Sequence, residues 1–426
     1  MITKIRATNC YVFSEKVELS LVADMRNKRF TSNVHQENNF NILKTIGIYG
    51  SNNVGKTCLL KCINAIQNAL LQKENIIRSN LFSGSSICEL GITFLEDGRE
   101  FEYDFIYDTK QRVYLYERFA EIKRDIYGNE TKDIYVIRDI LDSNHNVTLD
   151  SGALSLLTAV SNTGILIHVL NTDSFSKLNE MKNILSSFAE KIDIVDMNNI
   201  PLNHTINLMK RKSVLQDRVV EFIKNADVSM DDFQYVNDAE VKIDPSVLIN
   251  DKPNELVLNI ADNLAEQLKL RSVYRGVTVP SVFFDSTGTK KITALASYIV
   301  EALANGRIIL IDELDSSLHF KLTRAIVAMF NNELNKNAQL IFTVHDINLL
   351  DCKMLLRKEQ VWFVNKDDKG TYIYSLADFT ANQGVRDTTD IIAKYKKGAL
   401  GDLPEPELIN ILLSMELDME RSGENE

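Results

Sequence analysis

The sequence predicts an α/β fold, in which a mixed sheet with flanking helices is built from two separated halves of the chain. Two regions, one near each end of the 426 residues, alternate short apolar strands with helical patterns of apolar residues. A mostly helical segment lies between them. In each outer region, small, basic or acidic residues directly follow an apolar strand, which is where ligands bind in such sheets. Motifs of the two halves can share one site only if a single sheet is assembled from both.

The composition is that of a globular chain with a sizeable core. It is 45% hydrophobic and 25% charged, and its formal net charge of −11 disfavours a protein coated in nucleic acid, although local basic patches are compatible with it. The five cysteines have no paired spacing, so we expect reduced thiols in a cytoplasmic protein. The N-terminus has no apolar signal core. Polar residues interrupt residues 151–172 too often for a membrane span, so we expect a buried helix there and no membrane partner.

The N-terminal half begins with strands. Residues 2–13 and 16–22 alternate or run apolar, and residues 45–50, TIGIYG, form a short apolar strand that ends in glycine. Apolar residues at helical spacing follow over 58–72. Residues 88–108 place an Asp-Gly pair between two alternating runs, which predicts a β-hairpin.

The α/β pattern is then interrupted and returns. Residues 110–270 are predicted to be mostly helical, and residues 202–228 within them are typical of two consecutive helices. The elements expected after residue 278 are a strand over 306–313, a helix over 320–334, and strands over 338–346, 359–365 and 371–379. We therefore divide the chain into an N-terminal half of the α/β unit (1–109), a helical insertion (110–277), a C-terminal half (278–400) and a C-terminal helix with an acidic tail (401–426).

Residues 50–57, GSNNVGKT, match the phosphate-binding pattern G-x-x-x-x-G-K-[ST]. Its glycines let backbone N–H groups face the phosphates, Lys56 would reach the β- and γ-phosphates, and the Thr57 hydroxyl would bind Mg²⁺. A strand precedes the motif and a helix follows it, which is the context it requires; the alternative is an ordinary glycine-rich turn. The residues predicted to hold nucleotide here are Gly50, Ser51, Asn52, Asn53, Val54, Gly55, Lys56, Thr57 and Cys58.

Residues 308–313, IILIDE, predict the acidic half of the same site. Four apolar residues make a buried parallel strand, and Asp312 at its end would hold Mg²⁺, directly or through water. Glu313 stands next to it, where it could polarise the attacking water as a general base. The alternative is that both acids simply end a core strand and cap the next helix.

A histidine follows another apolar strand. Neutral His345, in FTVHD, could hydrogen-bond the γ-phosphate or the attacking water. A lone histidine is more often structural, but its position one strand after the acidic strand favours a catalytic role. His319 either sits at a helix start near a dimer face or lies on the surface.

A second candidate phosphate site lies far from the first. Residues 285–291, DSTGTKK, combine hydroxyls, a glycine and two lysines directly before a helical apolar run. The N–H groups at such a helix start point outward and carry the positive end of the helix dipole. This raises the question of why one protein would need two phosphate sites.

The order of these motifs resembles that of the ABC-type ATPases, in the branch shared with SMC-like and DNA-repair ATPases. It is most similar to bacterial AAA-family ATPases of the OLD/RloA type, which belong to abortive-infection and other anti-phage systems. The segments that carry the resemblance are DSTGTKK, LIDELDSSLH, FTVHDINLLD, RKEQVWFVNKDDKG and KYKKGALGDLP. The resemblance covers both ends of the chain and implies an ABC-like ATPase head with a helical insertion, using ATP and Mg²⁺.

By this resemblance, Lys56, Glu313 and His345 are the catalytic residues, Thr57 and Asp312 the metal ligands, and Asp315 the acid that contacts the partner subunit. The signature residues are Ser286, Thr287, Gly288 and Lys290. In the resembling families the signature faces the γ-phosphate held by another subunit, which implies a homodimer or higher oligomer with ATP at its interface. Thr289 replaces the second glycine of the usual signature, and no glutamine is found for the loop that usually contacts Mg²⁺.

The resemblance implies a nucleotide-switched ATPase that controls a separate effector, a nuclease or toxin, in an anti-phage system. About eighty residues follow His345 without an acidic cluster, so we expect no TOPRIM nuclease in this chain. One alternative is a DNA-repair or recombination ATPase that binds DNA; another is a scaffold that binds ATP without turnover, which Glu313 and His345 disfavour. The basic clusters that could contact DNA are Lys210-Arg211-Lys212, Arg271 with Arg275, and Lys394 with Lys396 and Lys397, although a solvated face is their commoner explanation.

Overall fold

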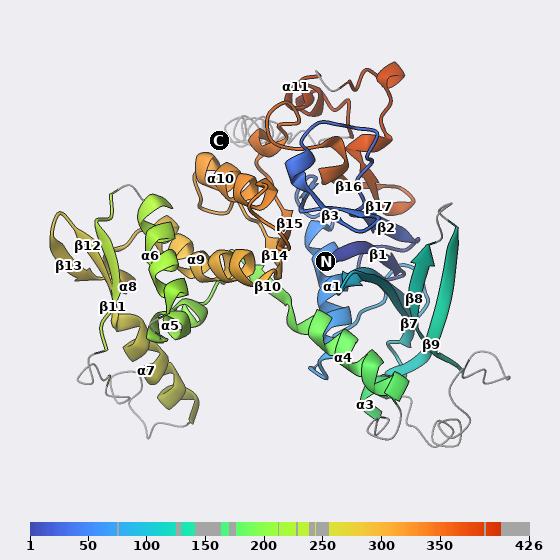
Figure 1. Cartoon of the computed structure of the whole chain (residues 1–426), viewed down its shortest axis with the longest axis horizontal. Coiled ribbons are helices and arrows are strands. Elements are labelled where there is room, and N and C mark those ends of the chain that lie inside the picture. The colour runs from blue at the N-terminus through green and yellow to red at the C-terminus, as the bar shows by residue number, and fades with distance from the viewer. Residues whose placement is uncertain are drawn as a thin grey trace, which may run out of the picture.

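The computed structural model contains two six-stranded sheets, the helices between and around them, and a smaller lobe set to one side (Figure 1). It describes residues 1–74, 76–124, 129–140, 163–169, 176–211, 213–226, 229–237, 243, 255–386 and 389–401. Within these ranges, no helix combines the length and the apolar character needed to cross a membrane. All five cysteines are free thiols, as expected.

The first sheet is antiparallel and comes from the N-terminal third of the chain. Its order is β2 (Val17–Ser20), β1 (Ile2–Thr8), β6 (Ile87–Glu96), β7 (Arg99–Asp108), β8 (Val113–Arg124) and β9 (Glu130–Asp139). Asp97 and Gly98 join β6 to β7 with φ of 50° and 71°. A two-residue hairpin turn requires this left-handed pair, so the predicted hairpin is confirmed.

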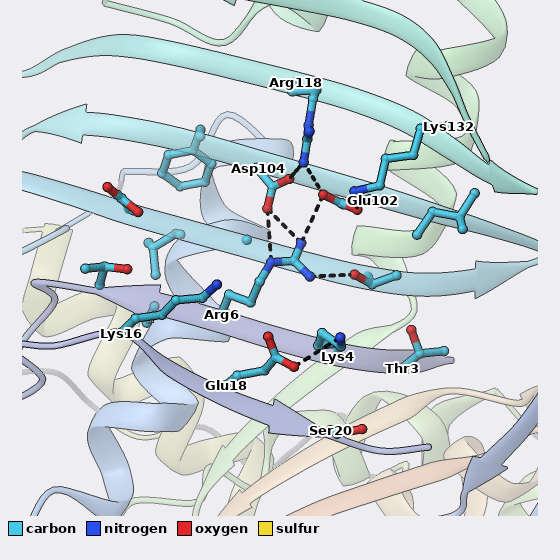
Figure 2. Close-up of a pocket in the computed structure, with 18 of the residues that line it drawn as sticks. Thr3, Lys4, Arg6, Lys16, Glu18, Ser20, Glu102, Asp104, Arg118 and Lys132 are labelled. Carbon is cyan, nitrogen blue, oxygen red and sulfur yellow. Dashed lines mark hydrogen bonds and ion pairs between the residues drawn. The ribbon is translucent and has the colours of Figure 1, made fainter. Parts of the chain in front are cut away.

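The outer face of this sheet is hollow and lined with charged side chains that pair across the strands (Figure 2). Arg6 on β1 and Arg118 on β8 each bind Asp104 on β7 at 2.7 Å. Lys132 on β9 donates to Glu102 on β7 at 2.6 Å. The hollow measures about 710 Å³. Because these cations already face carboxylates, a phosphate would have to compete for them, which makes this cavity a poor nucleotide site.

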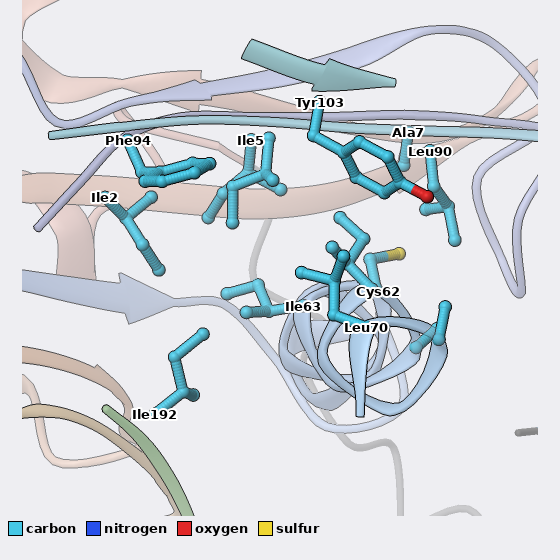
Figure 3. Packing of buried hydrophobic residues seen from close by; sticks show 14 of the residues in the cluster. Ile2, Ile5, Ala7, Cys62, Ile63, Leu70, Leu90, Phe94, Tyr103 and Ile192 are labelled. Atoms are coloured by element: carbon cyan, nitrogen blue, oxygen red, sulfur yellow. The ribbon is translucent and has the colours of Figure 1, made fainter. Parts of the chain in front are cut away.

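The inner face packs on helix α1 (Lys56–Leu70), which lies between the two sheets (Figure 3). Ile5 and Tyr103 of the first sheet share one buried cluster with Ile63 of α1 and Ile192 of the second sheet. Burying an aliphatic side chain of this size contributes roughly 1.5–3 kcal/mol. Because α1 packs against both sheets, the position of the loop directly before it, residues 50–55, is fixed as well.

The second sheet is assembled from both halves of the chain, as the motifs require. Its order is β10 (Ile192–Asp196), β14 (Ile308–Asp312), β15 (Gln339–Thr343), β5 (Thr45–Tyr49), β16 (Val361–Asp367) and β17 (Gly370–Ser375). The first five strands are parallel, and β17 pairs antiparallel with β16. The carboxyl ends of β5, β14 and β15 therefore meet at one edge of the sheet, where ligands bind.

Both faces of this sheet are covered. Ile308 and Leu310 of β14 belong to the cluster around α1, whereas Ile309 and Ile311 belong to a second cluster on the opposite face. The helices on that face are α9 (Thr287–Asn305) and α10 (Phe320–Asn331). Burial on both faces explains the continuous apolar run IILI. Both helices were expected from the sequence.

The smaller lobe packs on α9 and extends away from the sheets (Figure 1). Its elements are α5 (Asn203–Lys210), α6 (Val214–Ala226), β11 (Asp232–Tyr235), α7 (Glu255–Leu268), β12 (Leu270–Tyr274), β13 (Val277–Pro280) and α8 (Ser281–Phe284). The remaining described elements are β3 (Val34–Glu37), β4 (Phe40–Leu43), α3 (Leu166–Val169), α4 (Ser176–Glu190), α11 (Ile391–Lys396) and the 3₁₀ turns Thr31–Asn33, Ile347–Leu349, Lys358–Gln360, Leu376–Asp378 and Ala381–Gln383. The helix pair expected over 202–228 is α5 and α6.

The prediction of a mostly helical segment over 110–277 is wrong in three places. β8 and β9 extend the first sheet, β10 joins the second, and β11 to β13 form a small sheet in the lobe. Charged residues interrupt the alternation of apolar and polar residues that predicts a strand. In β8, for example, Arg118 is paired with carboxylates on the neighbouring strand and does not face open solvent. Of the buried helix expected over 151–172, only 163–169 are described and contain α3; the C-terminal helix expected after Gly401 lies outside the described residues.

Candidate nucleotide-binding site

The loop between β5 and α1 has the backbone conformation of a phosphate cradle. Gly50, Asn53 and Gly55 have φ of 150°, 63° and 109°. A Cβ on Gly50 would lie 2.4 Å from the carbonyl oxygen of Val364, and one on Gly55 would lie 2.4 Å from a methyl of Val12. Both glycines are therefore required by close approach as well as by conformation.

Lys56 is the first residue of α1 and points back into this loop. It is 6% exposed, and its Nζ donates to the carbonyls of Gly50 at 2.8 Å and Ser51 at 2.9 Å. Burial lowers the pKa of Lys56, while the charges of nearby carboxylates, Glu313 first among them, raise it in part. The loop thus holds a desolvated ammonium that phosphate oxygens would stabilise better than carbonyls do.

Two oxygen side chains from opposite ends of the chain meet beside Lys56. The Thr57 hydroxyl donates to Oδ1 of Asp312 at 3.1 Å, which joins α1 to the end of β14. A hydroxyl and a carboxylate are oxygen ligands of the kind that Mg²⁺ prefers together with phosphate oxygens. The two residues therefore fit the metal that the motifs imply.

Glu313 follows Asp312 in the left-handed conformation, with φ of 55°. Its Oε1 lies 3.7 Å from Nε2 of His345, and its Oε2 accepts a 2.8 Å hydrogen bond from the side-chain amide of Asn198. Lys56 lies 3.3 Å from the other ring nitrogen of His345, Nδ1. A lysine ammonium can only donate, so this contact fits a neutral imidazole with its proton on Nε2, facing Glu313.

Asn198 was missed by the sequence analysis. It stands just after β10, which lay hidden in the segment expected to be helical, and its Oδ1 accepts from the hydroxyl of Ser316 at 3.0 Å. The available signal was the short apolar strand IDIVD followed by polar residues. Gln67 is the glutamine nearest in sequence to the phosphate-binding loop of residues 50–57, the P-loop. It donates to the backbone carbonyls of Ala189 and Ile192 in the core.

Asp315 holds the loop that carries the histidine. Its Oδ2 accepts from the backbone N–H groups of His345 at 3.0 Å and Asp346 at 2.6 Å. Contact with a partner subunit stays a prediction for this residue. His319 is the N-cap of α10, where its Nδ1 accepts from the N–H of Lys321 at 3.3 Å, so its described contact is structural.

The P-loop, Glu313 and His345 surround a pocket of about 630 Å³. It is lined by Val12, Asn52, Asn53, Gly55, Lys56, Thr57, Cys58, Lys61, Glu313, Thr343 and His345. Val12, Lys61 and Thr343 had not been predicted. Burial raises the pKa of the Cys58 thiol, which keeps it protonated.

The signature residues do not line this pocket. Ser286 is instead the N-cap of α9, with its hydroxyl accepting from the N–H of Thr289 at 3.1 Å. A Cβ on Gly288 would lie 3.0 Å from the carbonyl oxygen of Ser317, so α9 begins against the loop after β14. The residue that binds this loop is Lys291, whose Nζ lies 3.0 Å from the Ser316 hydroxyl. Thr287 and Lys290 are not among the residues that line the nucleotide pocket, and their role stays a prediction.

The lobe is tied to the signature through Asp285. Its buried carboxylate accepts hydrogen bonds from the hydroxyls of Ser272 on β12 at 2.7 Å, Tyr274 at 2.8 Å and Ser281 on α8 at 2.5 Å. The residue directly before the signature is therefore bonded to the small sheet of the lobe.

Part of the basic surface considered for DNA is engaged within the chain. Lys210 pairs with Glu266 at 2.7 Å, and Lys394 donates to the carbonyl of Gln383 at 3.0 Å. Lys212 lies outside the described residues. DNA binding by these clusters stays a prediction.

A P-loop, an acidic strand end and a histidine strand end, brought together in one mostly parallel sheet, define a P-loop nucleotide-binding domain with a mixed α/β fold. The chain belongs to the family described as "AAA domain, putative AbiEii toxin, Type IV TA system", whose model matches residues 46–351. No curated protein sequence matches the chain.

Several solved structures of SMC head domains are similar to this chain. The SMC head domain from Thermotoga maritima has 11% identity and a TM-score of 0.41, covering 88% of this chain and 98% of that one. An SMC head bound to the C-winged helix domain of ScpA has 13% identity and a TM-score of 0.46, covering 88% and 97%. An Smc head with an extended coiled coil, bound to the C-terminal domain of ScpA derived from Pyrococcus furiosus, has 13% identity and a TM-score of 0.40, covering 90% and 97%.

Proposed function

We propose that this protein binds ATP with Mg²⁺ and hydrolyses it. The observation that carries the proposal is the convergence of residues from both halves of the chain on one pocket. Lys56, Thr57, Glu313 and His345 line it, and Asp312 is hydrogen-bonded to Thr57. A bound Mg²⁺ supplies charge that neutralises the phosphates during transfer. Thr57 and Asp312 would hold that metal.

The chain's own groups divide the remaining work. Lys56 exchanges its bonds to the Gly50 and Ser51 carbonyls for phosphate oxygens. Glu313 accepts the proton of the attacking water, and His345 would turn its Nε2 proton from Glu313 to the γ-phosphate once ATP is bound. Asn198 donates to Glu313 from the loop after β10, so this loop sets where the base stands.

We further propose that the working unit is a homodimer or higher oligomer with composite sites. The signature residues lie at the start of α9 and outside the pocket of their own chain, which supports a role at the pocket of another copy. This would explain why the chain carries two phosphate-binding motifs.

The setting we propose is a bacterial abortive-infection or toxin–antitoxin defence system, in which this ATPase of the OLD/RloA kind regulates a separate nuclease or toxin. The family description, which names an AbiEii-type toxin, supports that setting. The bond between Asp285 and the lobe offers a route by which nucleotide state would reach a protein bound there.

Substitution of the base tests the catalytic proposal. Glu313→Gln should retain Mg²⁺-dependent ATP binding but lose about 10²- to 10⁴-fold in turnover, because the amide cannot accept the proton. Glu333→Gln, at an exposed position on the loop after α10, is the matched control and should behave like the unaltered protein. Equal turnover in Glu313→Gln and the control would remove Glu313 as the base, and absence of ATP binding by the unaltered protein would overturn the proposal itself.

A further inference from the structure

Thr343 contacts the proposed catalytic residues but has no role of its own in the proposed hydrolysis. It is the last residue of β15, is 0% exposed, and contributes to the wall of the nucleotide pocket. Its hydroxyl lies 2.6 Å from Oδ1 of Asp312 and 2.8 Å from the backbone nitrogen of Glu313. One side chain thus contacts both the metal ligand and the residue that carries the base.

The direction of these two hydrogen bonds follows from their chemistry. An ionised carboxylate only accepts and a backbone N–H only donates, so the single hydroxyl proton of Thr343 goes to Asp312 and its oxygen receives the proton of Glu313. Among the described residues, the hydrogen bonds to the carboxylate of Asp312 come from Thr343 and Thr57, and both end on Oδ1. Oδ2 is left for a metal ion.

The bond to Glu313 stabilises an unfavourable backbone conformation. Glu313 has φ of 55°, a left-handed conformation that costs a residue with a Cβ roughly 1–2 kcal/mol. The Thr343 hydroxyl holds the N–H of this residue, and the Thr343 carbonyl accepts from the next N–H, that of Leu314, at 3.0 Å. The left-handed turn directs the Glu313 side chain into the pocket.

A second set of hydrogen bonds links the same two segments in the opposite direction. Asp315, two residues after Glu313, accepts from the N–H groups of His345 and Asp346, which follow Thr343. Hydrogen bonds therefore run in both directions between the segment that carries Glu313 and the segment that carries His345.

We propose that Thr343 is a positioning residue, whose hydroxyl orients Asp312 toward Mg²⁺ and holds Glu313 where it can act as the base. This inference rests on the proposed ATP hydrolysis. It identifies the hydroxyl, and not the size of the side chain, as the feature that matters.

The structure offers a matched control for this claim. Thr323 on α10 is also 0% exposed, but its hydroxyl has no hydrogen-bond partner among the described residues and lies outside the pocket. Threonine and valine have nearly the same shape, so Thr343→Val removes the two hydrogen bonds, whereas Thr323→Val removes only a buried hydroxyl.

The test compares Thr343→Val, Thr343→Ser and Thr323→Val by ATP turnover as a function of Mg²⁺ concentration. Thr343→Val should lower kcat about 10- to 100-fold and raise the Mg²⁺ concentration for half-maximal turnover severalfold, because hydrogen bonds to charged groups are lost. Thr343→Ser keeps the hydroxyl and should stay within about threefold of the unaltered protein. Thr323→Val should leave both quantities unchanged. Metal-free nucleotide binding should survive in all three variants.

Each other outcome has a distinct meaning. The inference would be overturned if Thr343→Val had the same kcat and Mg²⁺ dependence as Thr323→Val. It would also be overturned if Thr343→Ser and Thr343→Val lost equal activity. In both cases the ATPase proposal would stand. An unaltered protein that does not hydrolyse ATP would overturn the proposed function and this inference together. If Thr343→Val fails to fold, Thr343→Cys, whose thiol is a weak donor, should give the same Mg²⁺ shift, and no shift there would count against the claim.

Discussion

Glu102 lies deep in the charged face of the first sheet, with its side chain 7% exposed among three cations. Burial opposes its ionisation, but the hydrogen bonds with Asp104 and Lys132 and the charges of Arg118 and Arg6 outweigh burial and lower its pKa to about 2. A carboxyl whose pKa falls on folding stabilises the folded state above its unfolded pKa. That contribution disappears as the pH falls through the folded value.

Glu102→Gln should therefore destabilise the protein at pH 7 by about 1–3 kcal/mol, because it leaves cations facing a neutral amide. The deficit should begin to shrink below pH 5, where the carboxyl of the unfolded chain takes up its proton, and should disappear only as the pH falls through about 2, where the folded carboxyl does so. Urea unfolding of both proteins at pH 7, 5 and 3 measures this difference.

Glu130→Gln serves as the comparison, since Glu130 pairs with Arg124 on the same sheet but its side chain is 51% exposed. It should cost less than about 1 kcal/mol at any pH, because solvent screens an exposed pair. A Glu102 deficit that does not change between pH 7 and pH 3 would show that the effect is steric and not electrostatic.

Among the strands, β6 carries a glycine, Gly91, at a position where a larger residue would not fit. Gly91 pairs with Arg6 on β1 and with Asp104 on β7, so it stands between the two partners of an ion pair. A Cβ there would lie 2.1 Å from Oδ1 of Asp104 and 3.0 Å from Nε of Arg6. The glycine lets the arginine cross β6 and bind a carboxylate two strands away.

Gly91→Ala should lower the free energy of unfolding by about 1–3 kcal/mol, because the new methyl displaces the Arg6–Asp104 pair. In an Asp104→Ala background the same substitution should cost much less, since the clashing oxygen is gone. Denaturant unfolding of the four proteins of this double-mutant cycle measures the coupling. Equal costs in both backgrounds would mean that Gly91 is needed for some other reason.

At the scale of the whole molecule, the separation of the two phosphate motifs makes a prediction about stoichiometry. Lys56→Ala removes the P-loop cation, and Thr287→Arg places a large side chain at the start of α9; each variant alone should lose ATPase activity. In a mixed dimer, one site would combine the intact P-loop of one copy with the intact signature of the other. An equimolar mixture should therefore recover up to about a quarter of the normal rate.

The control for this mixture is Lys56→Ala combined with the double variant Lys56→Ala/Thr287→Arg, which contains no intact P-loop and should recover nothing. Gel filtration of Glu313→Gln with ATP should show the dimer directly, because ATP stays bound without turnover. No recovery in the first mixture, together with a monomer in this second measurement, would contradict composite sites.

The residues that the sequence identified are those whose function depends on neighbours in the chain. Gly50, Gly55, Lys56 and Thr57 form a local motif, and the apolar run before Asp312 is typical of a strand buried on both faces, so both could be predicted from the sequence. The same reasoning predicted a sheet assembled from both halves of the chain, since the motifs need one common edge.

The features that the sequence did not predict depend on side chains that meet from distant strands. β8 and β9 contain many charges that are neutralised across the sheet, so no local pattern marks them as strands. Asn198 and Thr343 join the site through hydrogen bonds to Glu313 from residues 115 and 30 positions away in the sequence. Local periodicity reports burial and conformation, whereas such partnerships exist only once the fold has brought the strand ends together. The P-loop, the two acids and the histidine could therefore be predicted from local patterns, but the contacts that hold them could not.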